Sequence, residues 1–474
     1  MVFSSIEFLC FFLPLLFVVY FIVPKSLRGV RNTILLLFSL FFYAYGGPRF
    51  LLLMLVSVAI DYFCGLFACP AFDRRIRKAA VAAAAVAGTG LLCYYKYMGF
   101  FAESINAFGF HLPIPEITLP IGISFYTFQG LSYVIDVYRE DAKVQRNPLR
   151  LALYIAFFPQ LVAGPIVRYT TVEREIGSRQ ETFDEFYNGT VRFLLGFAKK
   201  MLLANPMGQI ADGIFSLSGS SLSTSLAWVG AIAYTFQIYF DFSAYSDMAI
   251  GLGRMFGFHF LENFKYPYIS KSITEFWRRW HISLSTWFRD YVYIPLGGNR
   301  KGKARHIRNI AVVWFLTGMW HGASWNFILW GLWFCVLLLG EKYIWGSIIK
   351  KMPVWLQHIY AMVLVIISWV LFRCETLPQV ITYVSTMFGF GQGGLWSSQT
   401  LYYLIEYRIE LIIACIAALP VKNILKYGLI RRRRKNWCKL CLNWGPAIVS
   451  LAFFLLAYIQ LAAGSFNPFI YFRF

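Results

Sequence analysis

Long apolar runs separated by short basic connections recur along the whole chain, and they constrain its fold more than any other feature. About 20 apolar residues cross a bilayer as a helix, and only structures that satisfy their own backbone hydrogen bonds can span it. We therefore predict an all-α polytopic membrane protein with about 11 transmembrane helices, together with re-entrant and interfacial helices. The spanning candidates are residues 6–23, 33–45, 50–69, 79–95, 119–137, 151–167, 226–251, 311–339, 354–372, 401–419 and 447–463.

The composition agrees with this class of protein. The 474 residues are 58% hydrophobic and 14% charged, whereas soluble domains are about half apolar and about 25% charged. Lys and Arg outnumber Asp and Glu by 44 to 23, but they cluster in the connections, as the positive-inside rule predicts. We therefore expect membrane lipid and no nucleic acid as a partner, although an anionic cytosolic cosubstrate could use the same charge.

Local patterns argue against a disulfide framework, a zinc site and a cleaved signal peptide. Nine cysteines are scattered along the chain, and the Cys438/Cys441 pair has no second pair to complete a zinc site. The first apolar run carries Glu7, follows no basic residue and ends in Pro24-Lys25. A cleaved signal peptide would have the opposite features, so we interpret this run as a retained first helix.

The basic connections also predict the orientation of the chain. The connections after the first and third helices are rich in Lys and Arg, whereas those after the second and fourth are not. Basic connections stay in the cytosol, so the N-terminus is predicted to lie outside. The strongly basic stretch 422–439 is also predicted to be cytosolic, and the last helix then places Phe474 outside.

His321 is the most informative single residue. It lies in Gly318-Met-Trp-His-Gly-Ala-Ser-Trp, and residues 311–339 contain no Asp, Glu, Lys or Arg. An ionisable ring at membrane depth is costly and usually faces a cavity or carries function. Its imidazole can exchange a proton near neutral pH, as a general base must. A structural histidine bonded to a neighbouring helix is the alternative, and His321 alone does not decide between them.

The charges around this run predict a chain reversal near His321. Basic segments flank it on both sides, at residues 300–308 and 342–351. If both are cytosolic, the chain must enter the membrane and return, yet 29 residues cover only about 44 Å as a helix. We therefore expect a turn at His321, with Gly318 and Gly322 permitting the break. Broken backbone at that depth must line a protein cavity.

A second histidine, His281, lies in an aromatic and basic segment that is predicted to be one helix at the membrane surface. Ser272 and Glu275 form a capping box, and Pro295 with the following glycines ends the helix. Aromatic and apolar residues recur at helical spacing, which is typical of an interfacial element. The stripe consists of Phe276, Trp280, Leu284, Trp287 and Tyr291. Ordinary positive-inside charge explains most of the basic residues but does not explain His281.

The run 226–251 carries polar residues at helical spacing. Gln237, Asp241 and Tyr245 share one face of the predicted helix, and Asp247 points elsewhere. Carboxylates at this depth must face protein or water, so structural or cavity-lining roles are favoured over catalysis. The preceding amphipathic segment 191–214 is predicted to lie in the membrane interface.

At these residues the chain resembles a known family. Phe276-Trp-Arg-Arg-Trp-His-Ile-Ser-Leu-Ser-Thr-Trp-Phe-Arg-Asp-Tyr-Val-Tyr-Ile-Pro-Leu-Gly-Gly-Asn-Arg and Trp320-His-Gly-Ala-Ser-Trp resemble the two signature segments of the membrane-bound O-acyltransferase (MBOAT) superfamily. The likeness is to the alginate O-acetyltransferase-like branch. It extends over nearly the whole chain through the segments that begin at Met1, Phe158, Gln237 and Asn467. The family's invariant histidine corresponds to His321, and its second polar position corresponds to His281.

The resemblance implies a fold, a reaction and a set of site residues. Residues 1–474 would form a single integral membrane acyltransferase domain around a central tunnel. His321 would act as the base, with His281 as the second catalytic residue. No permanently bound cofactor and no metal is implied, and acetyl-CoA would be the acyl donor. We expect Arg278, Arg279 and Arg289 to hold its phosphates. The residues expected to line the tunnel are Trp277, Trp320, Ser324, Gln237, Asp241 and Tyr245.

The resemblance also implies a place in the cell and partners. The protein would lie in the bacterial inner membrane and pass acetyl groups from cytosolic acetyl-CoA to an extracytoplasmic, serine-hydrolase-like partner. The final acceptor would be a cell-surface polysaccharide, such as an alginate-like exopolysaccharide, cellulose or peptidoglycan. One alternative is D-alanyl transfer to teichoic acid, in a sister branch. A polysaccharide or lipid transporter is more distant, because no internal repeat is evident.

Overall fold

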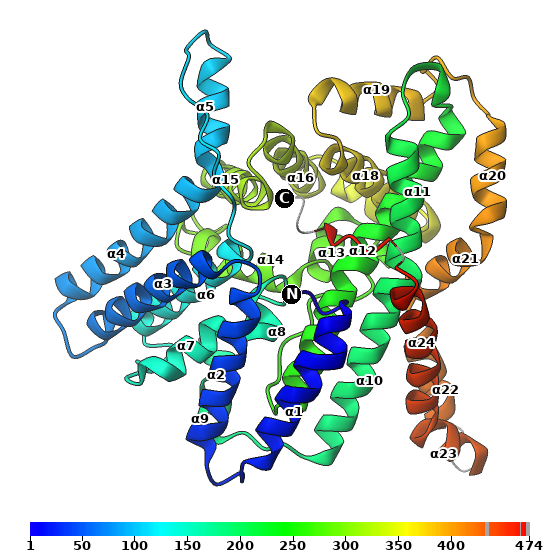
Figure 1. The fold of residues 1–474 in the computed structure, drawn as a ribbon. Coiled ribbons are helices and arrows are strands. Elements are labelled where there is room, and N and C mark those ends of the chain that lie inside the picture. The colour runs from blue at the N-terminus through cyan, green and yellow to red at the C-terminus, as the bar shows by residue number, and fades with distance from the viewer. Residues whose placement is uncertain (432–435, 465, 471–474) are drawn as a thin grey trace. The chain divides into compact units, whose positions relative to one another are not determined.

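The computed structural model describes residues 1–431, 436–464 and 466–470, and the regular secondary structure of this part is entirely helical. Figure 1 shows the helices in order along the chain, and they divide into two compact units. The first consists of residues 1–193 and 246–261, and the second consists of residues 194–245 and the described residues from 262 onward. The prediction of an all-α chain is therefore confirmed for the described residues.

The first unit contains the N-terminal helices. α3 (Pro48–Ala68), α4 (Arg74–Leu92) and α6 (Ile123–Arg139) pack against one another, and α2 (Arg28–Ala44) packs against α7 (Pro148–Ala156). The other elements are the π-helical turns η1 (Phe8–Phe12) and η2 (Cys93–Tyr97), α1 (Leu13–Ile22), α5 (Met98–Asn106), α8 (Phe158–Leu161) and α9 (Tyr169–Ser178). Two long helices, α10 (Phe183–Lys199) and α12 (Thr224–Met255), contribute residues to both units.

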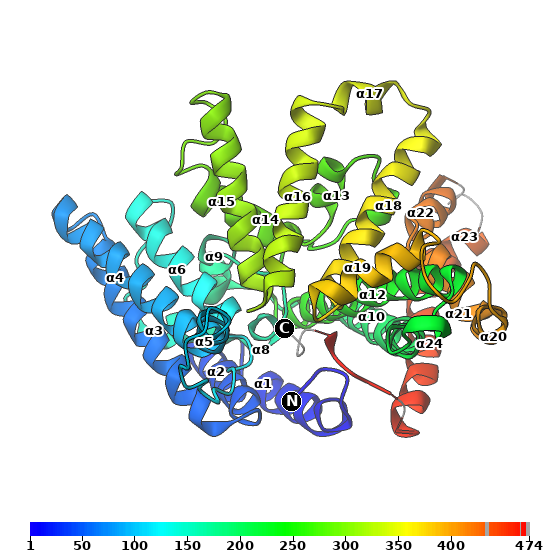
Figure 2. The ribbon, with the colours of Figure 1, turned by 90° about the horizontal axis from the view of Figure 1, so that it is seen from above.

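The second unit is organised around a helical hairpin. α15 (Lys303–His321) and α16 (Trp325–Tyr343) lie side by side, and α18 (Val354–Arg373) packs against α16 (Figure 2). α13 (Ile273–Arg279) packs on α16 and α18. The remaining elements are η3 (Lys200–Ala204), α11 (Asn205–Phe215), η4 (Gly219–Ser221), η5 (Pro267–Ile269), α14 (Ile282–Phe288), η6 (Arg289–Tyr293), α17 (Gly346–Lys351), α19 (Leu377–Met387), α20 (Ser398–Glu406), α21 (Arg408–Ala417), α22 (Val421–Arg431), α23 (Asn436–Asn443) and α24 (Gly445–Ala462).

Several helices are suited to crossing a membrane. Among the described residues, four segments are long and apolar enough to do so, namely Pro48–Ala68, Arg74–Asn106, Val354–Arg373 and Gly445–Ala462. All four correspond to predicted runs, although the second is longer because α4 continues through η2 into α5. A multi-pass membrane protein is thereby confirmed, whereas the predicted total of about 11 spans stays a prediction.

Two predicted spans are not single helices, and the prediction is wrong for both. The run 151–167 is divided at Phe157 between α7 and α8. Pro159 follows the break, and its ring would clash with the carbonyl group of the preceding turn if the helix continued. The run 401–419 is divided at Tyr407. There the Arg408 side chain donates a hydrogen bond to the Ile405 carbonyl oxygen at 2.6 Å, which satisfies the end of α20.

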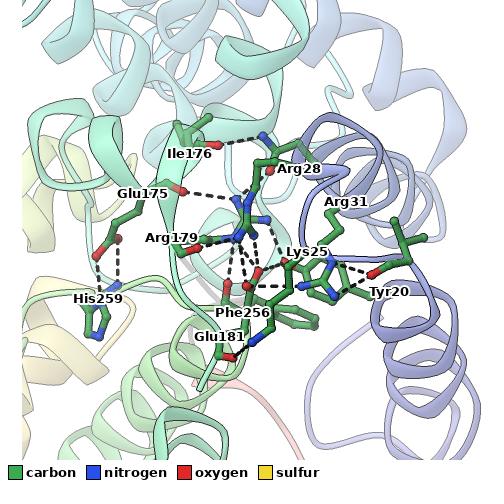
Figure 3. A network of polar contacts seen from close by, with 12 residues as sticks. Tyr20, Lys25, Arg28, Arg31, Glu175, Ile176, Arg179, Glu181, Phe256 and His259 are labelled. Carbon is green, nitrogen blue, oxygen red and sulfur yellow. Dashed lines mark hydrogen bonds and ion pairs between the residues drawn. The ribbon is translucent and has the colours of Figure 1, made fainter. Parts of the chain in front are cut away.

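A buried ionic network in the first unit joins α1, α2 and the connection between α9 and α10 (Figure 3). Its centre is Glu181, which forms ion pairs with Arg28, Arg31 and Arg179. The Tyr20 hydroxyl donates to Glu181 Oε1 at 2.5 Å. Burial alone would raise the pKa of the Glu181 carboxyl, but hydrogen bonds from Arg28 and Tyr20 and the charge of Arg179 lower it to about 2. Glu181 is therefore an anion at physiological pH.

The same network gives a structural role to the basic residues that follow the first helix. The sequence alone explains them only as a signal for the orientation of the chain in the membrane. Lys25 donates to the Glu181 carbonyl oxygen at 2.9 Å, and Arg31 donates to the carbonyl oxygen of Val23. Arg179 donates to Asn32 Oδ1 at 2.7 Å. The connection after the first helix is therefore a structural element of the unit as well as a basic segment.

Candidate active site

The candidate site begins at the hairpin turn. α15 ends at His321 and α16 begins at Trp325, so the predicted reversal of the chain at His321 is confirmed. Three glycines let the two helices approach. A Cβ atom on Gly318, Gly322 or Gly331 would collide with the facing helix or with the Phe327 ring. The turn is therefore specified by close packing in which glycine has no substitute.

The hairpin is longer than the charge-free run predicts. α15 begins at Lys303 and α16 ends at Tyr343, beyond both ends of the charge-free run. Each helix therefore has 19 residues, or about 28 Å. A shortage of residues does not force the turn. It is fixed by the glycine contacts and by a connection of only Gly322, Ala323 and Ser324.

The predicted helix around His281 is broken, and this prediction is wrong. α13 starts after Ser272, whose hydroxyl accepts from the Glu275 backbone N–H at 3.0 Å as expected. The helix ends at Arg279, and α14 begins at Ile282. Between them His281 has the left-handed conformation, with φ of 43° and ψ of 54°. This conformation is uncommon for residues other than glycine.

Long-range hydrogen bonds hold that break open. The Ile282 backbone N–H donates to the Asn263 carbonyl oxygen at 3.0 Å, and the Lys265 backbone N–H donates to the Arg279 carbonyl oxygen at 2.9 Å. The Asn263 side chain also contacts the His281 ring: Asn263 Oδ1 lies 3.2 Å from His281 Nδ1. Asn263 could not be predicted as a site residue from the sequence, since its partners lie about 20 residues further along the chain.

α13 is attached to the hairpin through its N-terminus. The Glu341 carboxylate accepts from the backbone N–H groups of Ile273 and Thr274 at 2.6 and 2.9 Å. The first N–H groups of a helix have no partner within the helix and attract anions. Glu341 lies on α16, so this contact fixes α13 against the helix that follows His321.

The two histidines predicted to be catalytic lie close together. Their ring centroids are 6.5 Å apart. His281 is 0% and His321 is 8% exposed, and burial lowers the pKa of His281 to about 3, so His281 is neutral at physiological pH. Both histidines lie among aromatic side chains. Rings whose centroids lie within 6 Å of one of the histidines include those of Phe242, Trp320, Trp330 and Phe372.

The residues predicted to line a tunnel divide into two groups. Trp320 contacts both histidines, and Trp277 packs on Trp314 and Phe334 in the aromatic core beside them. Ser324 is the N-cap residue of α16. The second group comes from α12. Gln237 lies against Gly208, and the Tyr245 ring is 5.0 Å from that of Phe469.

Asp241 has a structural partner that its own segment does not reveal. Its carboxylate pairs with Lys200 Nζ at 2.7 Å, and both side chains are buried. Asp241 Oδ2 also accepts from the Ile470 backbone N–H at 2.8 Å, and Lys200 donates to the Pro468 carbonyl oxygen. Asp241 therefore anchors the segment 467–470. Asp247 pairs with Arg192 at 2.8 Å. These contacts favour the structural interpretation of both carboxylates.

The three arginines predicted to bind phosphate differ in their contacts. Arg279 pairs with Glu275 at 2.8 Å, and Arg289 pairs with Asp290 at 2.6 Å. Arg278 is exposed and has no ion pair within the described part of the chain. Its charge is therefore the one most open to a ligand.

Comparison with known proteins decides the family. Residues 139–377 match the model of the membrane-bound O-acyltransferase (MBOAT) family, which is half of the chain. The chain belongs to the MBOAT family. It is 39% identical to a probable alginate O-acetylase, AlgI, of Azotobacter vinelandii over 100% of both chains. It is 44% identical to the Pseudomonas aeruginosa protein of that name over 82% of this chain and 75% of that one.

Two further relatives have names that give other acceptors. The chain is 30% identical to the peptidoglycan O-acetyltransferase of Helicobacter pylori over 100% of this chain and 98% of that one. It is 30% identical to the teichoic acid D-alanyltransferase of Bacillus subtilis, but over only 51% of this chain and 64% of that one. The resemblance found in the sequence is confirmed, and this MBOAT protein is an O-acyltransferase.

Proposed function

We propose that this MBOAT protein transfers the acetyl group of cytosolic acetyl-CoA to an extracytoplasmic acceptor, for O-acetylation of a cell-surface polysaccharide. The observation that carries the proposal is the pair of buried histidines, 6.5 Å apart, at the hairpin turn and the helix break. The acceptor would be an alginate-like exopolysaccharide, cellulose or peptidoglycan. Names of relatives that match the full chain favour acetyl transfer over D-alanyl transfer.

His321 would act as the general base. As the acceptor hydroxyl attacks the thioester carbonyl carbon, the His321 imidazole takes the hydroxyl proton. The C–S bond then breaks, and CoA leaves as a thiolate. The new ester is formed without a redox step, and the thiolate collects a proton when His321 is regenerated. The aromatic rings around His321 would exclude water that could hydrolyse the thioester.

The position of His321 along α15 suits a reaction inside the membrane. Ile310 begins the apolar part of the helix, and His321 lies 11 residues further on, or about 16 Å along the axis. A bilayer core is about 30 Å thick, so His321 would lie near its midplane. We therefore propose that residues 1–474 act as one acyltransferase domain with a tunnel that donor and acceptor enter from opposite sides. The acceptor side would be served by an extracytoplasmic, serine-hydrolase-like partner.

The proposed reaction can be tested with purified full-length protein in detergent. Acetyl-CoA is supplied with a short polysaccharide acceptor, together with the partner protein where one is required, and free CoA is measured with a thiol reagent. Acetyl transfer predicts CoA release that depends on the acceptor, with acetyl ester on the product. A transporter would release no CoA and would form no acetyl ester. Absence of both with every acceptor class would remove the acetyltransferase assignment.

Of the three arginines, Arg278 is expected to contribute most to the binding of acetyl-CoA. Arg278→Gln should weaken acetyl-CoA binding about tenfold, because a charge-assisted hydrogen bond contributes about 1.5–3 kcal/mol. Arg279→Gln and Arg289→Gln should have smaller effects, since each already pairs with a carboxylate. Equilibrium binding at two salt concentrations is the measurement, and the Arg278 effect should grow at low salt. If all three variants bind acetyl-CoA as tightly as the wild type does, these charges serve only as orientation signals.

The proposed orientation, with both termini outside, makes a labelling prediction. A single cysteine at Tyr45, in the connection after α2, should react with an impermeant thiol reagent in intact cells. A single cysteine at Lys78, near the start of α4, should react only after the cells are permeabilised. Both positions are exposed, and both variants are made without the nine native cysteines. The reverse pattern would invert the N-terminal topology.

A further inference from the structure

Asn263 occupies an unusual position beside His281. Its side chain is 0% exposed. Its Oδ1 atom lies 3.1 Å from the Ser283 backbone nitrogen, 2.9 Å from Ser283 Oγ and 3.2 Å from His281 Nδ1. Its backbone oxygen accepts from the Ile282 N–H at 3.0 Å. One buried residue thus contacts both the histidine ring and the backbone of the break that presents it.

These contacts determine which nitrogen of His281 carries the proton. A backbone N–H can only donate, so the Asn263 atom that faces Ser283 N must be the amide oxygen. An amide oxygen can only accept, so the His281 Nδ1 that faces the same atom must be a donor. A neutral imidazole has one N–H. Its lone pair is therefore on Nε2.

The Nε2 atom can accept a hydrogen bond from a reacting group. It is buried and has no hydrogen-bond partner among the described residues. The ring centroids of His281 and His321 are 6.5 Å apart, too far for a direct hydrogen bond between the rings. A single oxygen atom between them could lie about 3 Å from a nitrogen of each ring. A hydroxyl group or a water molecule would supply that oxygen.

We propose that Asn263 is a positioning residue that holds His281 as the Nδ1–H tautomer, so that Nε2 accepts a hydrogen bond during the reaction. His281 then cannot donate to the carbonyl oxygen of the thioester, and oxyanion stabilisation must come from other groups. The acceptor role of Nε2 would instead orient the hydroxyl group, or a water bonded to protonated His321. The tautomer follows from the hydrogen bonds of a buried, neutral ring, whereas its use in catalysis rests on the acetyl transfer proposed above.

The tautomer can be measured without any activity. The chain has six histidines, so full-length protein labelled with ¹⁵N-histidine in detergent gives few signals, and the His281 signals are those lost in His281→Asn. We expect a protonated Nδ1 and an unprotonated Nε2 in the wild type. Asn263→Ala should shift a measurable share of His281 to the Nε2–H tautomer. A wild-type His281 protonated on Nε2, or an unchanged tautomer in Asn263→Ala, would overturn the assignment.

Kinetics separate positioning from general damage to the fold. Asn263→Ala should lower kcat at least about tenfold, because a His281 protonated on Nε2 cannot accept the hydrogen bond that orients the reacting groups, and should leave KM for acetyl-CoA within about twofold. Asn263→Asp keeps an acceptor toward Nδ1 and should retain activity within about fivefold at about pH 8, where imidazolium is disfavoured. Loss of kcat in Asn263→Asp equal to that in Asn263→Ala would overturn the positioning role.

Asn326 provides the matched control. It is also a buried asparagine of the second unit, and its amide donates to the Cys374 carbonyl oxygen at 2.6 Å. Asn326→Ala should destabilise the protein but leave the His281 tautomer unchanged. The same tautomer shift in both variants would show a general packing effect and overturn the role of Asn263. An Nδ1–H tautomer in a wild type that releases no CoA would overturn acetyl transfer and not the fixing of the tautomer by Asn263.

Discussion

Replacing His321 with alanine is expected to lower acetyl transfer by at least about 10², the lower end of what a general base contributes. Membrane insertion and acetyl-CoA binding should stay largely intact, because the imidazole lies at the end of α15 and the hairpin is held by glycine contacts. His321→Gln should be nearly as inactive, since glutamine can form hydrogen bonds but cannot take the proton. Turnover and donor binding are measured on the same purified samples.

His306 supplies the control for this experiment. It is a buried histidine on the same helix, and its ring nitrogens contact the Tyr343 hydroxyl at 2.9 Å and Lys342 Nζ at 3.2 Å. His306→Gln retains hydrogen-bonding groups and should keep kcat within about threefold, as a structural histidine would. Near-normal turnover in His321→Gln would remove the base assignment and restore the structural interpretation of His321.

Among the proposed substitutions, Glu181→Gln is expected to lower the free energy of unfolding the most. It leaves Arg28, Arg31 and Arg179 without their shared carboxylate, and removing one partner of a buried ionic group costs about 3–5 kcal/mol. Thermal and denaturant unfolding in detergent measure the effect. Glu140→Gln is the control, because Glu140 pairs with Arg77 at 2.9 Å but its side chain is 58% exposed. Its loss should cost less than about 1 kcal/mol.

The effect of Glu181 should also depend on pH in a defined direction. The pKa of Glu181 is lowered in the folded protein to about 2, from its ordinary value of 4.5. Its contribution is therefore fully present above pH 4.5 and is lost as the pH falls toward 2. The stability difference between wild type and Glu181→Gln should shrink over this range. A difference that stays constant down to pH 2 would show that the carboxylate charge does not stabilise the network.

The chain reversal at His321 could be predicted from sequence because its signals are local. Basic residues on both sides of one apolar run fix the side on which each end lies, and Gly318 and Gly322 mark the point of close approach. The length of the hairpin could not be predicted in the same way. Lys303 and Lys342 lie within α15 and α16, because a helix can extend into the polar interface while its charged side chains reach water.

The break at His281 could not be predicted, because its causes are not local. The aromatic residues keep helical spacing from Phe276 to Tyr291 across the break, so the periodicity of the sequence indicates one helix. The left-handed residue is stabilised by hydrogen bonds to Asn263, in a segment without a recognisable pattern. Tertiary contacts of this kind override local propensity. The predicted pairing of the two histidines as site residues came from the family resemblance.

The polar residues of α12 show the same limit. Helical spacing correctly suggests that Asp241 faces protein, but the partner of a buried carboxylate is set by the fold. Lys200 belongs to a segment that the sequence places at the membrane interface, yet its side chain is 3% exposed and paired with Asp241. Amphipathic spacing does not separate a lysine that faces lipid headgroups from one that neutralises a buried acid.

The left-handed backbone at His281 restricts which amino acids can replace this histidine in evolution or in the laboratory. Among residues with a Cβ atom, asparagine, aspartate and histidine enter this region of φ and ψ most readily, and β-branched residues are strongly disfavoured. His281→Asn therefore removes the imidazole while keeping the backbone, whereas His281→Val would disturb both. Main-chain geometry therefore limits which residues fit at position 281, independently of what the reaction requires of the side chain.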